Sequence, residues 1–558
     1  MQANVLKWDR LIYLDGAMGT MLQKAGLTGG GLPECLNITH PGVIEEIHRQ
    51  YIKAGSDIIT TNTFNANGIK FKNHKYTLED VITSAVNLAK RQAGDKFVAL
   101  DVGPTGQLIE PLGDISFEEA YNTFSRVVKI GAKAGADIIL IETMSDLYEA
   151  RAAVLAAKEN CNLPVFCTMT LGASGRTLTG TDPVTMVHVL AGLGIDAIGV
   201  NCSLGPKELM EIVKQIIMTS KIPVIVQPNA GMPTLRNGET IYAIHPNEFA
   251  KAMKEFVEMG VQVIGGCCGT GPDFISYMKA LLQDFKLVKR DLPSVSVVCS
   301  SRMSVILGQE IKIVGERINP IGKKKLKEAL KNNDMDYIVD EALEQKCAGA
   351  NILDVNIGFS EINQKKVIVD VIKELQSRVD LPLQIDSMSA EVIENALRVY
   401  NGKAIINSVN GTMKSMEEIF PLAKKYGACV VAVTLDEKGI PKTAEERYLI
   451  AEKIINKAFE YNILKENIII DCLVLPNSTD DAEMTETVKA VRIVKERLGV
   501  VTTLGVSNIS FGPPNRELIN RTFLAKALEA GLDVPIINPL DQGAMDIVEA
   551  YKALKNQG

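Results

Sequence analysis

Two segments of the sequence place cysteines where they could bind a metal ion together. Cys267 and Cys268 are adjacent and flanked by glycines in GGCCGT (265–270), and Cys202 follows another apolar run in GVNCS (199–203). Adjacent side chains on an extended strand point to opposite faces, so both thiols reach one ligand only where the strand gives way to a loop, which the glycines allow. Three thiolates with an open fourth position suit a catalytic Zn²⁺.

The other interpretation of a free cysteine is a small, buried apolar side chain. That interpretation is expected for the remaining seven cysteines: Cys35, Cys161, Cys167, Cys299, Cys347, Cys429 and Cys472. For Cys202, Cys267 and Cys268 we favour the metal site, because all three stand at the ends of predicted strands. No Cys-x-x-Cys pair offers a fourth thiol, which argues against a closed structural zinc site.

The second half of the chain places carboxylates and amides, rather than thiols, after its apolar runs. These groups stand in GERINP (315–320), LDVNIG (353–358), QIDS (384–387), INSVNG (406–411) and IIIDCL (468–473). Each acid alone could be a helix N-cap or a structural hydrogen bond. Together they predict a site that binds its ligand through hydrogen bonds and that contains no metal constellation.

The elements that position the thiols alternate between short β-rich runs and amphipathic stretches, which indicates parallel βαβ units. The expected strands of the first half are 11–16, 57–64, 97–104, 136–143, 164–170, 197–203, 223–229 and 261–268. Eight such units in under 290 residues match a (β/α)₈ barrel, whose site lies at the carboxyl ends of the strands.

The same pattern restarts after residue 303. Its expected strands are 311–319, 350–358, 382–387, 403–411, 429–436, 467–476, 502–512 and 534–540. The prediction is therefore an α/β protein with two TIM barrels in tandem, 1–290 and 306–558, joined by a linker at 291–305. A doubly wound open sheet is the alternative for either half, but no GxGxxG follows the first strand and no Walker motif occurs.

Composition narrows the functional classes further. The chain has 558 residues, is 46% hydrophobic and carries a net charge of −7, which argues against nucleic acid as a partner. No signal peptide and no apolar run long enough to span a membrane are visible. Ten cysteines without a regular framework fit a reducing compartment, so a cytoplasmic location is expected.

Four further segments of the first half, taken with the cysteine segments, form a pattern that is specific to one family. Together with DGAMGT (15–20), TNTF (61–64), ETM (142–144) and QPNAG (227–231), they resemble the homocysteine S-methyltransferase family. The resemblance implies that Cys202, Cys267 and Cys268 bind zinc and that the sulfur of homocysteine takes the open position. It also implies that the side chain of Asn229 can bind the metal ion when the substrate is absent.

The same resemblance implies how the rest of the amino acid is bound. Asp15 and Glu142 match the acids that hold the amino group of the substrate, and the backbone from Gly16 to Thr20 would receive its carboxylate. Without the resemblance, a helix cap or an ion pair at the barrel mouth would account for either acid. A zinc-bound thiol is deprotonated at neutral pH and is then a good nucleophile.

The second half is similar to the pterin-binding methyltransferase family, through the five segments above and GVSNISFGPPNR (505–516). The resemblance implies that Asp386 and Asp471 hold the pterin ring, assisted by Asn407, and that Asn508 hydrogen-bonds near N5, the atom that carries the methyl group. The amidine-like edge of a pterin can donate two parallel hydrogen bonds to a carboxylate. The other expected pocket residues are Glu316, Asn319, Asp354, Asn356, Gly505 and Arg516, the last of which would meet the folate tail.

The two resemblances imply methyl transfer from 5-methyltetrahydrofolate, through a cobalamin carrier, to zinc-bound homocysteine, giving methionine and tetrahydrofolate. The alternatives are a corrinoid-dependent methyltransferase with another thiol acceptor and a non-catalytic scaffold that binds folate and zinc. None of the five histidines stands in the Asp-x-His-x-x-Gly motif of the family's cobalamin module. The corrinoid is therefore expected on a module of a longer enzyme or on a separate protein.

Overall fold

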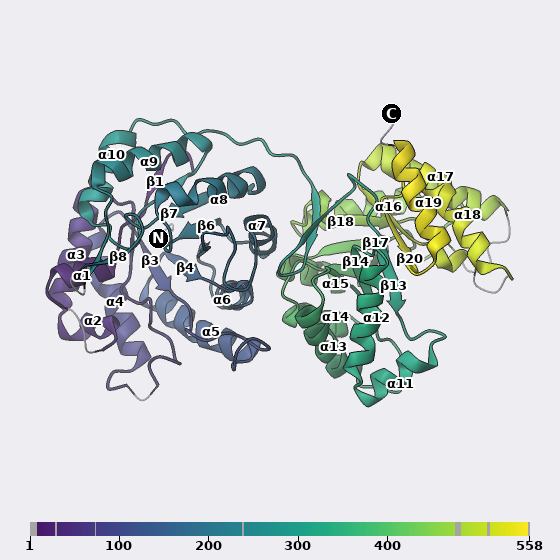
Figure 1. Cartoon of the computed structure of the whole chain (residues 1–558), viewed down its shortest axis with the longest axis horizontal. Helices are drawn as coiled ribbons and strands as arrows, with labels where there is room; N and C mark the ends of the chain where they lie inside the picture. Colours follow the sequence, from purple (N-terminus) through teal and green to yellow (C-terminus); the bar gives the residue numbers. More distant parts are fainter. Residues whose placement is uncertain are drawn as a thin grey trace. The chain divides into compact units, whose positions relative to one another are not determined.

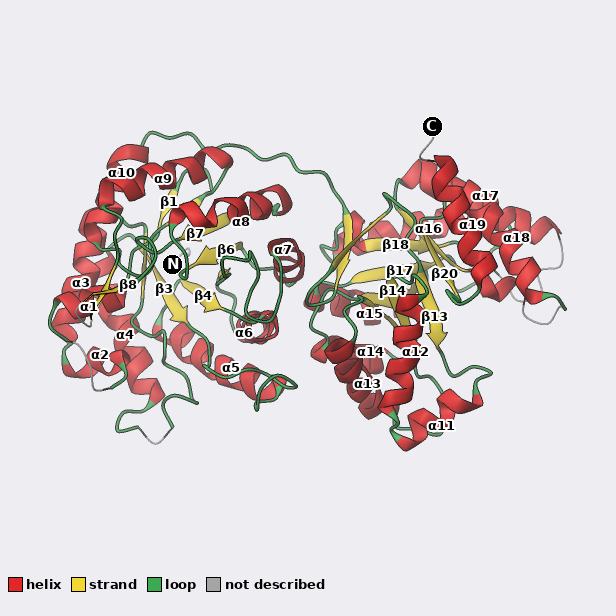
Figure 2. Ribbon diagram, in the orientation of Figure 1, coloured by secondary structure: helices red, strands yellow, loops and turns green. Residues whose placement is uncertain are grey.

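Two compact units, Met1–Leu292 and Pro293–Gly558, make up the chain. The computed structural model describes residues 8–27, 31–72, 74–236, 239–474, 481–510 and 514–555. In each unit, helices surround a central parallel sheet (Figures 1 and 2). Within the described part of the chain, no helix combines the length and the apolar character needed to cross a bilayer.

The first unit is a parallel barrel of eight strands in the order β1-β10-β7-β6-β5-β4-β3-β2, and a bridge between Leu14 and Ile58 joins its two edges. The strands are β1 Ile12–Tyr13, β2 Ile58–Thr60, β3 Phe97–Val102, β4 Ile138–Met144, β5 Val165–Met169, β6 Ala197–Asn201, β7 Val224–Gln227 and β10 Val263–Ile264. A short antiparallel hairpin, β8 Thr234–Arg236 and β9 Glu239–Ile241, extends the loop after β7.

Helices cover the outside of this barrel. They are α1 Met18–Lys24, η1 Pro33–Cys35, α2 Leu36–Thr39, α3 Pro41–Ala54, α4 Leu78–Ala93, α5 Phe117–Ala134, α6 Leu147–Asn160, α7 Pro183–Gly192, α8 Pro206–Thr219, α9 Pro246–Met259 and α10 Pro272–Leu282. Capping boxes begin α4 at Thr77 and α5 at Ser116, and prolines occupy the first turn of several others.

Inside the first barrel, apolar and polar side chains separate along the strands. Residues near the strand starts, such as Ile58, Ile138 and Phe166, form a buried apolar cluster against which Trp8 packs. The strand ends instead carry buried polar residues, including Asp101 and Asn201. The apolar cluster closes one end of the barrel, and the polar groups gather at the other end, where a site is expected.

The second unit is a closed barrel with strands in sequential order. The strands are β13 Val314–Ile318, β14 Ile352–Asn356, β15 Leu383–Asp386, β16 Ile405–Asn410, β17 Cys429–Val433, β18 Ile468–Asp471, β19 Val501–Gly505 and β20 Val534–Ile537. The helices are α11 Lys324–Asn332, α12 Met335–Cys347, α13 Gln364–Arg378, α14 Ala390–Val399, α15 Met413–Tyr426, α16 Ala444–Glu460, η2 Lys465–Asn467, α17 Asp481–Leu498, η3 Val506–Ser510, α18 Arg516–Glu529 and α19 Gln542–Lys555.

An antiparallel hairpin precedes the second barrel, formed by β11 Ser296–Cys299 and β12 Ser304–Leu307. It occupies most of the 291–305 stretch in which the sequence suggested a linker. Its side chains of Val298, Val305 and Leu307 join the apolar cluster at the strand starts of the second barrel. Cys299 also exchanges backbone hydrogen bonds with Lys403, so the hairpin packs as part of the second unit.

The structure confirms the predicted fold class of two tandem (β/α)₈ barrels, and the open doubly wound sheet is wrong for both halves. Each of the sixteen expected strands overlaps an observed barrel strand, although β4 ends one residue later and β19 begins one residue earlier than expected. Most observed strands are shorter than the expected runs, because the last residues of those runs leave the ladder and form the loops at the barrel mouth.

Candidate functional site

The sulfur atoms of Cys202, Cys267 and Cys268 form one cluster at the mouth of the first barrel. All three lie within 4.8 Å of one another, and the Sγ atoms of Cys202 and Cys268 are 3.9 Å apart. Zn–S bonds of about 2.3 Å in a tetrahedral site separate the sulfurs by about 3.8 Å. The cluster therefore fits a zinc ion with little rearrangement.

The loops that carry these cysteines are shaped by positive φ angles and close backbone contacts. Cys202 follows β6 with φ +61°, and its N–H donates to the carbonyl of Gln227 at 3.0 Å. Gly266 allows the loop with the adjacent cysteines to pack against Thr270, because a Cβ at this position would lie 2.3 Å from Oγ1 of Thr270. That hydroxyl donates to the carbonyl of Cys267 at 2.7 Å, so the glycine and the threonine together fix the adjacent cysteines.

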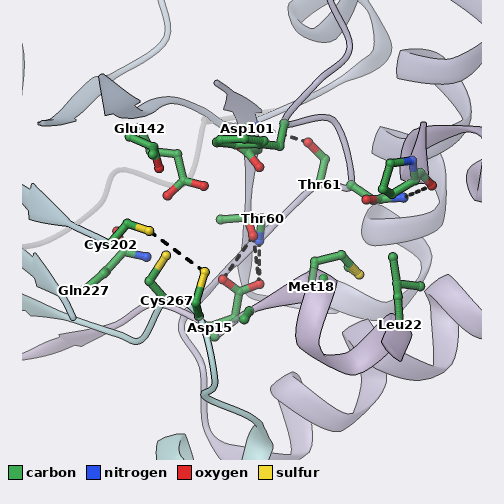
Figure 3. Close-up of a pocket in the computed structure, with 18 of the residues that line it drawn as sticks. Asp15, Met18, Leu22, Thr60, Thr61, Asp101, Glu142, Cys202, Gln227 and Cys267 are labelled. Carbon is green, nitrogen blue, oxygen red and sulfur yellow. Dashed lines mark hydrogen bonds between the residues drawn. The ribbon is translucent and has the colours of Figure 1, made fainter. Parts of the chain in front are cut away.

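The thiols line a cavity of about 420 Å³ at the barrel mouth. In Figure 3, Cys202 and Cys267 lie on one side of this space, Glu142 and Asp101 on another, and Asp15 beside Thr60 on a third. The other residues that line it are Gly16, Ala17, Met18, Gly19, Leu22, Pro33, Glu34, Thr60, Thr61, Asn62, Phe64, Asn65, Thr143, Gln227, Gly266 and Cys268. The cavity thus combines thiols with several carboxyl groups.

Burial dominates the ionisation of the carboxyl groups in the cavity. It raises the pKa of Asp15 to about 8, although the N–H and hydroxyl of Thr60 contact its carboxylate at 2.7 and 3.1 Å. Burial likewise raises the pKa of Glu142 to about 7 and that of Asp101 well above its ordinary value. A cavity that disfavours its own carboxylates is suited to a cationic group, whose charge would stabilise the ionised forms.

Hydrogen bonds among the thiols also set their ionisation. Contacts from Cys202 and Cys267 lower the pKa of Cys268 to about 3, and the same kind of contact raises the pKa of Cys267. One thiolate is therefore favoured before any metal binds. A dication would convert the remaining thiols into thiolates as well.

The predicted residues of the first barrel do not all face the cavity. Asp15, Gly16, Glu142 and the three cysteines line it, whereas Thr20 accepts a hydrogen bond from the N–H of Gly269 at 3.0 Å and so ties α1 to the cysteine loop. Asn229 is buried, and its Oδ1 has no hydrogen-bond partner. An unpartnered amide oxygen on the neighbouring strand end is compatible with the metal contact expected for it.

Two residues of this site, Glu34 and Tyr242, were not predicted from the sequence. Asp101 was a candidate only through its place at the end of a predicted strand; it lies near the end of β3 and its side chain is buried. Glu34 reaches the cavity from η1, outside any strand, and nothing in its local sequence marks it. Tyr242 follows β9, and its ring packs over Gly269, where a Cβ would lie 2.4 Å from its Cγ.

In the second barrel, polar side chains of three neighbouring strands meet at the mouth. The register places Asn356, Asp386 and Asn407 side by side on β14, β15 and β16. Nδ2 of Asn356 donates to Oδ2 of Asp386 at 2.8 Å. One layer deeper, Gln384 donates to Asp354 at 2.7 Å. Burial raises the pKa of Asp354 and of Asp386, so both acids lie in a water-poor environment.

Asp471 and Glu316 occupy other sides of the same mouth. Asp471 ends β18, and its Oδ1 accepts the N–H of Leu473 at 2.7 Å. Burial raises its pKa to about 6. Glu316 on β13 accepts the hydroxyl of Ser507 at 2.6 Å, and burial raises its pKa as well.

Three further predicted residues of the second barrel lie outside its strands. Asn508 is exposed on η3, where its amide lies over Gly505, because a Cβ at that glycine would be 2.8 Å from Nδ2. Arg516 is exposed at the start of α18 and donates to Ser510 at 3.1 Å, whereas Asn319 caps the N–H of Ile321 at 3.1 Å. Their roles toward a ligand stay predictions.

Comparison with known proteins agrees with this division of the chain. Residues 12–282 match the family model for homocysteine S-methyltransferase, and residues 315–538 match the model for pterin binding enzymes. The chain is 33% identical to the methionine synthases of Mycobacterium tuberculosis (566 residues) and Mycobacterium leprae (572 residues), in each case over 95% of this chain and 47% of the relative. It thus spans about half the length of these curated relatives.

Among solved structures, the metallated homocysteine methyltransferase MmuM from Escherichia coli matches 49% of this chain and 96% of its own, with 25% identity and a TM-score of 0.43. By the family models, the first barrel is similar to a homocysteine S-methyltransferase domain and the second to a pterin binding enzyme. Over 95% of its length, the chain is similar to the methionine synthases of the two mycobacteria.

Proposed function

We propose that this chain carries the two substrate sites of a methionine-forming methyltransferase. The first barrel binds homocysteine, the second binds 5-methyltetrahydrofolate, and a corrinoid on another module or protein carries the methyl group between them. The products are methionine and tetrahydrofolate. The observation that carries the proposal is the cluster of three thiols, within 4.8 Å of one another, in a cavity that also contains carboxyl groups.

In the first barrel, Cys202, Cys267 and Cys268 would hold the zinc ion, with Asn229 as a further ligand in the substrate-free site. When bound, zinc supplies a positive charge that lowers the pKa of a substrate thiol, so that the thiol reacts as a thiolate at neutral pH. The chain's own part is to supply three sulfur ligands and to leave the fourth position open to the cavity.

The carboxyl groups of the cavity would recognise the amino group of homocysteine. Asp15 and Glu142 line the same cavity as the thiols, and Asp101 stands beside Glu142 (Figure 3). An ammonium group would lower their raised pKa values and donate hydrogen bonds to the ionised carboxylates. The backbone at Gly16, which also lines the cavity, would receive the carboxylate of the substrate.

In the second barrel, Asp386 and Asp471 would accept hydrogen bonds from the pterin ring, with Asn407 beside them. The remaining wall would come from Glu316, Asn319, Asp354, Asn356 and Gly505, and Arg516 would meet the folate tail. Methyl transfer from N5 is assisted when N5 is protonated, because the departing nitrogen is then neutral. The amide oxygen of Asn508 can accept a hydrogen bond from that protonated nitrogen, although an amide cannot supply the proton.

A substrate competition experiment tests this assignment. The zinc-loaded chain, free methylcobalamin and labelled homocysteine are mixed with other thiols, and the methylated products are separated. Preferential methylation of homocysteine supports the proposal. Preference for another thiol would assign a different acceptor, and retained folate affinity without any methyl transfer to or from added cobalamin would indicate a binding scaffold.

A further inference from the structure

Arg447 is a buried guanidinium group that none of the roles above uses. It lies on the first turn of α16, it is 0% exposed, and an arginine side chain keeps its charge at every accessible pH. Because burying a charge without compensation is costly, the contacts of this side chain indicate what it stabilises.

Those contacts converge on the turn that follows β18. Nη1 of Arg447 donates to the carbonyl oxygens of Cys472 and Leu473, at 3.0 and 2.9 Å. The same nitrogen donates to Oγ1 of Thr487 on α17 at 2.6 Å, and Nε donates to the carbonyl of Pro441 at 3.2 Å. One side chain therefore joins α16 and α17 to the two residues directly after Asp471.

The turn itself has an unfavourable backbone conformation. Leu473 has φ +54°, in the left-handed region that is unfavourable for a residue with a Cβ. Its N–H donates to Oδ1 of Asp471 at 2.7 Å, so the turn and the carboxylate are directly linked. Arg447 binds the carbonyl of the same residue, so it holds Leu473 in the position that orients the carboxylate.

We propose that Arg447 is a positioning residue for the pterin site: it fixes the Cys472–Leu473 turn so that the carboxylate of Asp471 stays ionised and aimed at the ring. The proposal rests on the role given to Asp471 in the proposed function. The positive charge of Arg447 also acts directly, because it partly offsets the burial that raises the pKa of Asp471.

Two titratable groups among the described residues accompany Asp471 and Arg447. The thiol of Cys472 interacts electrostatically with Asp471, and Glu486 of α17 interacts with Arg447. Loss of the guanidinium charge therefore leaves no other cation among these groups to favour the carboxylate. The pKa of Asp471 is then expected to rise.

The test is calorimetric titration of the full chain with 5-methyltetrahydrofolate between pH 5.5 and 8.5. For R447M, we expect about tenfold weaker binding at pH 7 and a pH midpoint of binding at least one unit higher than in the parent chain, since the ring needs the ionised carboxylate. R447K keeps the charge and should restore the midpoint but not the full affinity. R497M removes an exposed arginine that pairs α17 with α16 and should change neither quantity.

Two further variants make the outcome decisive. T487V removes the hydroxyl that Arg447 contacts and should weaken folate binding severalfold without moving the pH midpoint of binding. If R447M does not fold, R447K and T487V together test the proposal. The proposal is overturned if D471N loses binding while R447M, or R447K and T487V, bind as the parent chain does at every pH. If D471N itself binds normally, the role of Asp471 in the proposed function fails and the positioning role falls with it.

Discussion

Nδ2 of Asn201 lies 3.0 Å from Oε2 of Glu142, and the next residue in the chain is Cys202. The side-chain oxygen of Asn201 accepts the N–H of Thr143 at 2.9 Å and the hydroxyl of Thr168 at 2.8 Å, so the amide is held from both ends. The end of β6 thus orients both a proposed substrate carboxylate and a proposed zinc thiolate.

Replacement of Asn201 by alanine should separate these two effects. The variant loses the hydrogen bonds that orient Glu142. We expect the free energy of homocysteine binding to become less favourable by about 1–2 kcal/mol, which corresponds to roughly tenfold weaker binding. Calorimetric titration of the zinc-loaded variant measures this change. Its zinc content should stay close to one per chain, because all three thiols remain; loss of zinc would show that Asn201 acts on the metal site instead.

Replacement of Cys268 by serine should remove the metal site. A serine hydroxyl is a poor zinc ligand at neutral pH, so we expect at least a hundredfold loss of zinc affinity in competition with a chelator. C161S is the matched control in the same barrel, because the Cys161 thiol donates to the carbonyl of Ala157 at 3.4 Å, a hydrogen bond that a hydroxyl can replace. Equal zinc affinity of C268S and C161S would contradict the assignment.

Replacement of Asp15 by asparagine should change the pH dependence of stability. The folded-state pKa of Asp15, about 8, lies above the unfolded value of about 4, so the folded chain binds more protons between these values. The free energy of unfolding therefore falls as pH rises through this window. D15N should be more stable than the parent chain at pH 8, by about 2 kcal/mol, and similar to it at pH 4.

Urea unfolding of the zinc-free chains at both pH values measures this difference, and D15N should bind homocysteine more weakly although it is more stable. A variant that is less stable than the parent at pH 8 would mean that Asp15 is ionised and paired in the empty site. A stabilising change that harms binding is expected where a site keeps buried acids for its ligand.

Replacement of Asp386 by asparagine should weaken binding of 5-methyltetrahydrofolate about 10- to 100-fold, because a charged acceptor that receives hydrogen bonds from the ring is lost. D336N is the matched control, since Asp336 is an exposed partner of Arg378 on the surface of the same barrel. Titration of both variants at pH 7.5 provides the measurement. An unchanged dissociation constant for D386N would place the pterin pocket elsewhere.

Much of the fold could be predicted from the sequence because buried parallel strands have a strong local signal. Each barrel strand is a short run rich in β-branched residues, bounded by polar or glycine-rich turns, as in β4 and β18. The two hairpins were not predicted. β8 and β9 lack an apolar run, and the valines of β11 stand inside a stretch whose other residues resemble a linker.

The candidate site was predictable to the extent that its residues end strands. This rule alone assigns Glu142 and the three cysteines to one barrel mouth. It could not place Glu34, which approaches from a helical loop, or Arg447, which stands inside an ordinary amphipathic helix. The importance of these two residues depends on contacts between segments that are far apart in sequence, and a single sequence does not record such contacts.

The most direct test of the proposed function is methionine formation from homocysteine and free methylcobalamin by the full chain, with and without a zinc chelator. We predict activity that is lost on chelation, is restored by added Zn²⁺ and is absent in C268S. Methylation that persists in a chain shown to be free of zinc would contradict the account, and so would a chain that holds one zinc ion on these cysteines and yet forms no methionine.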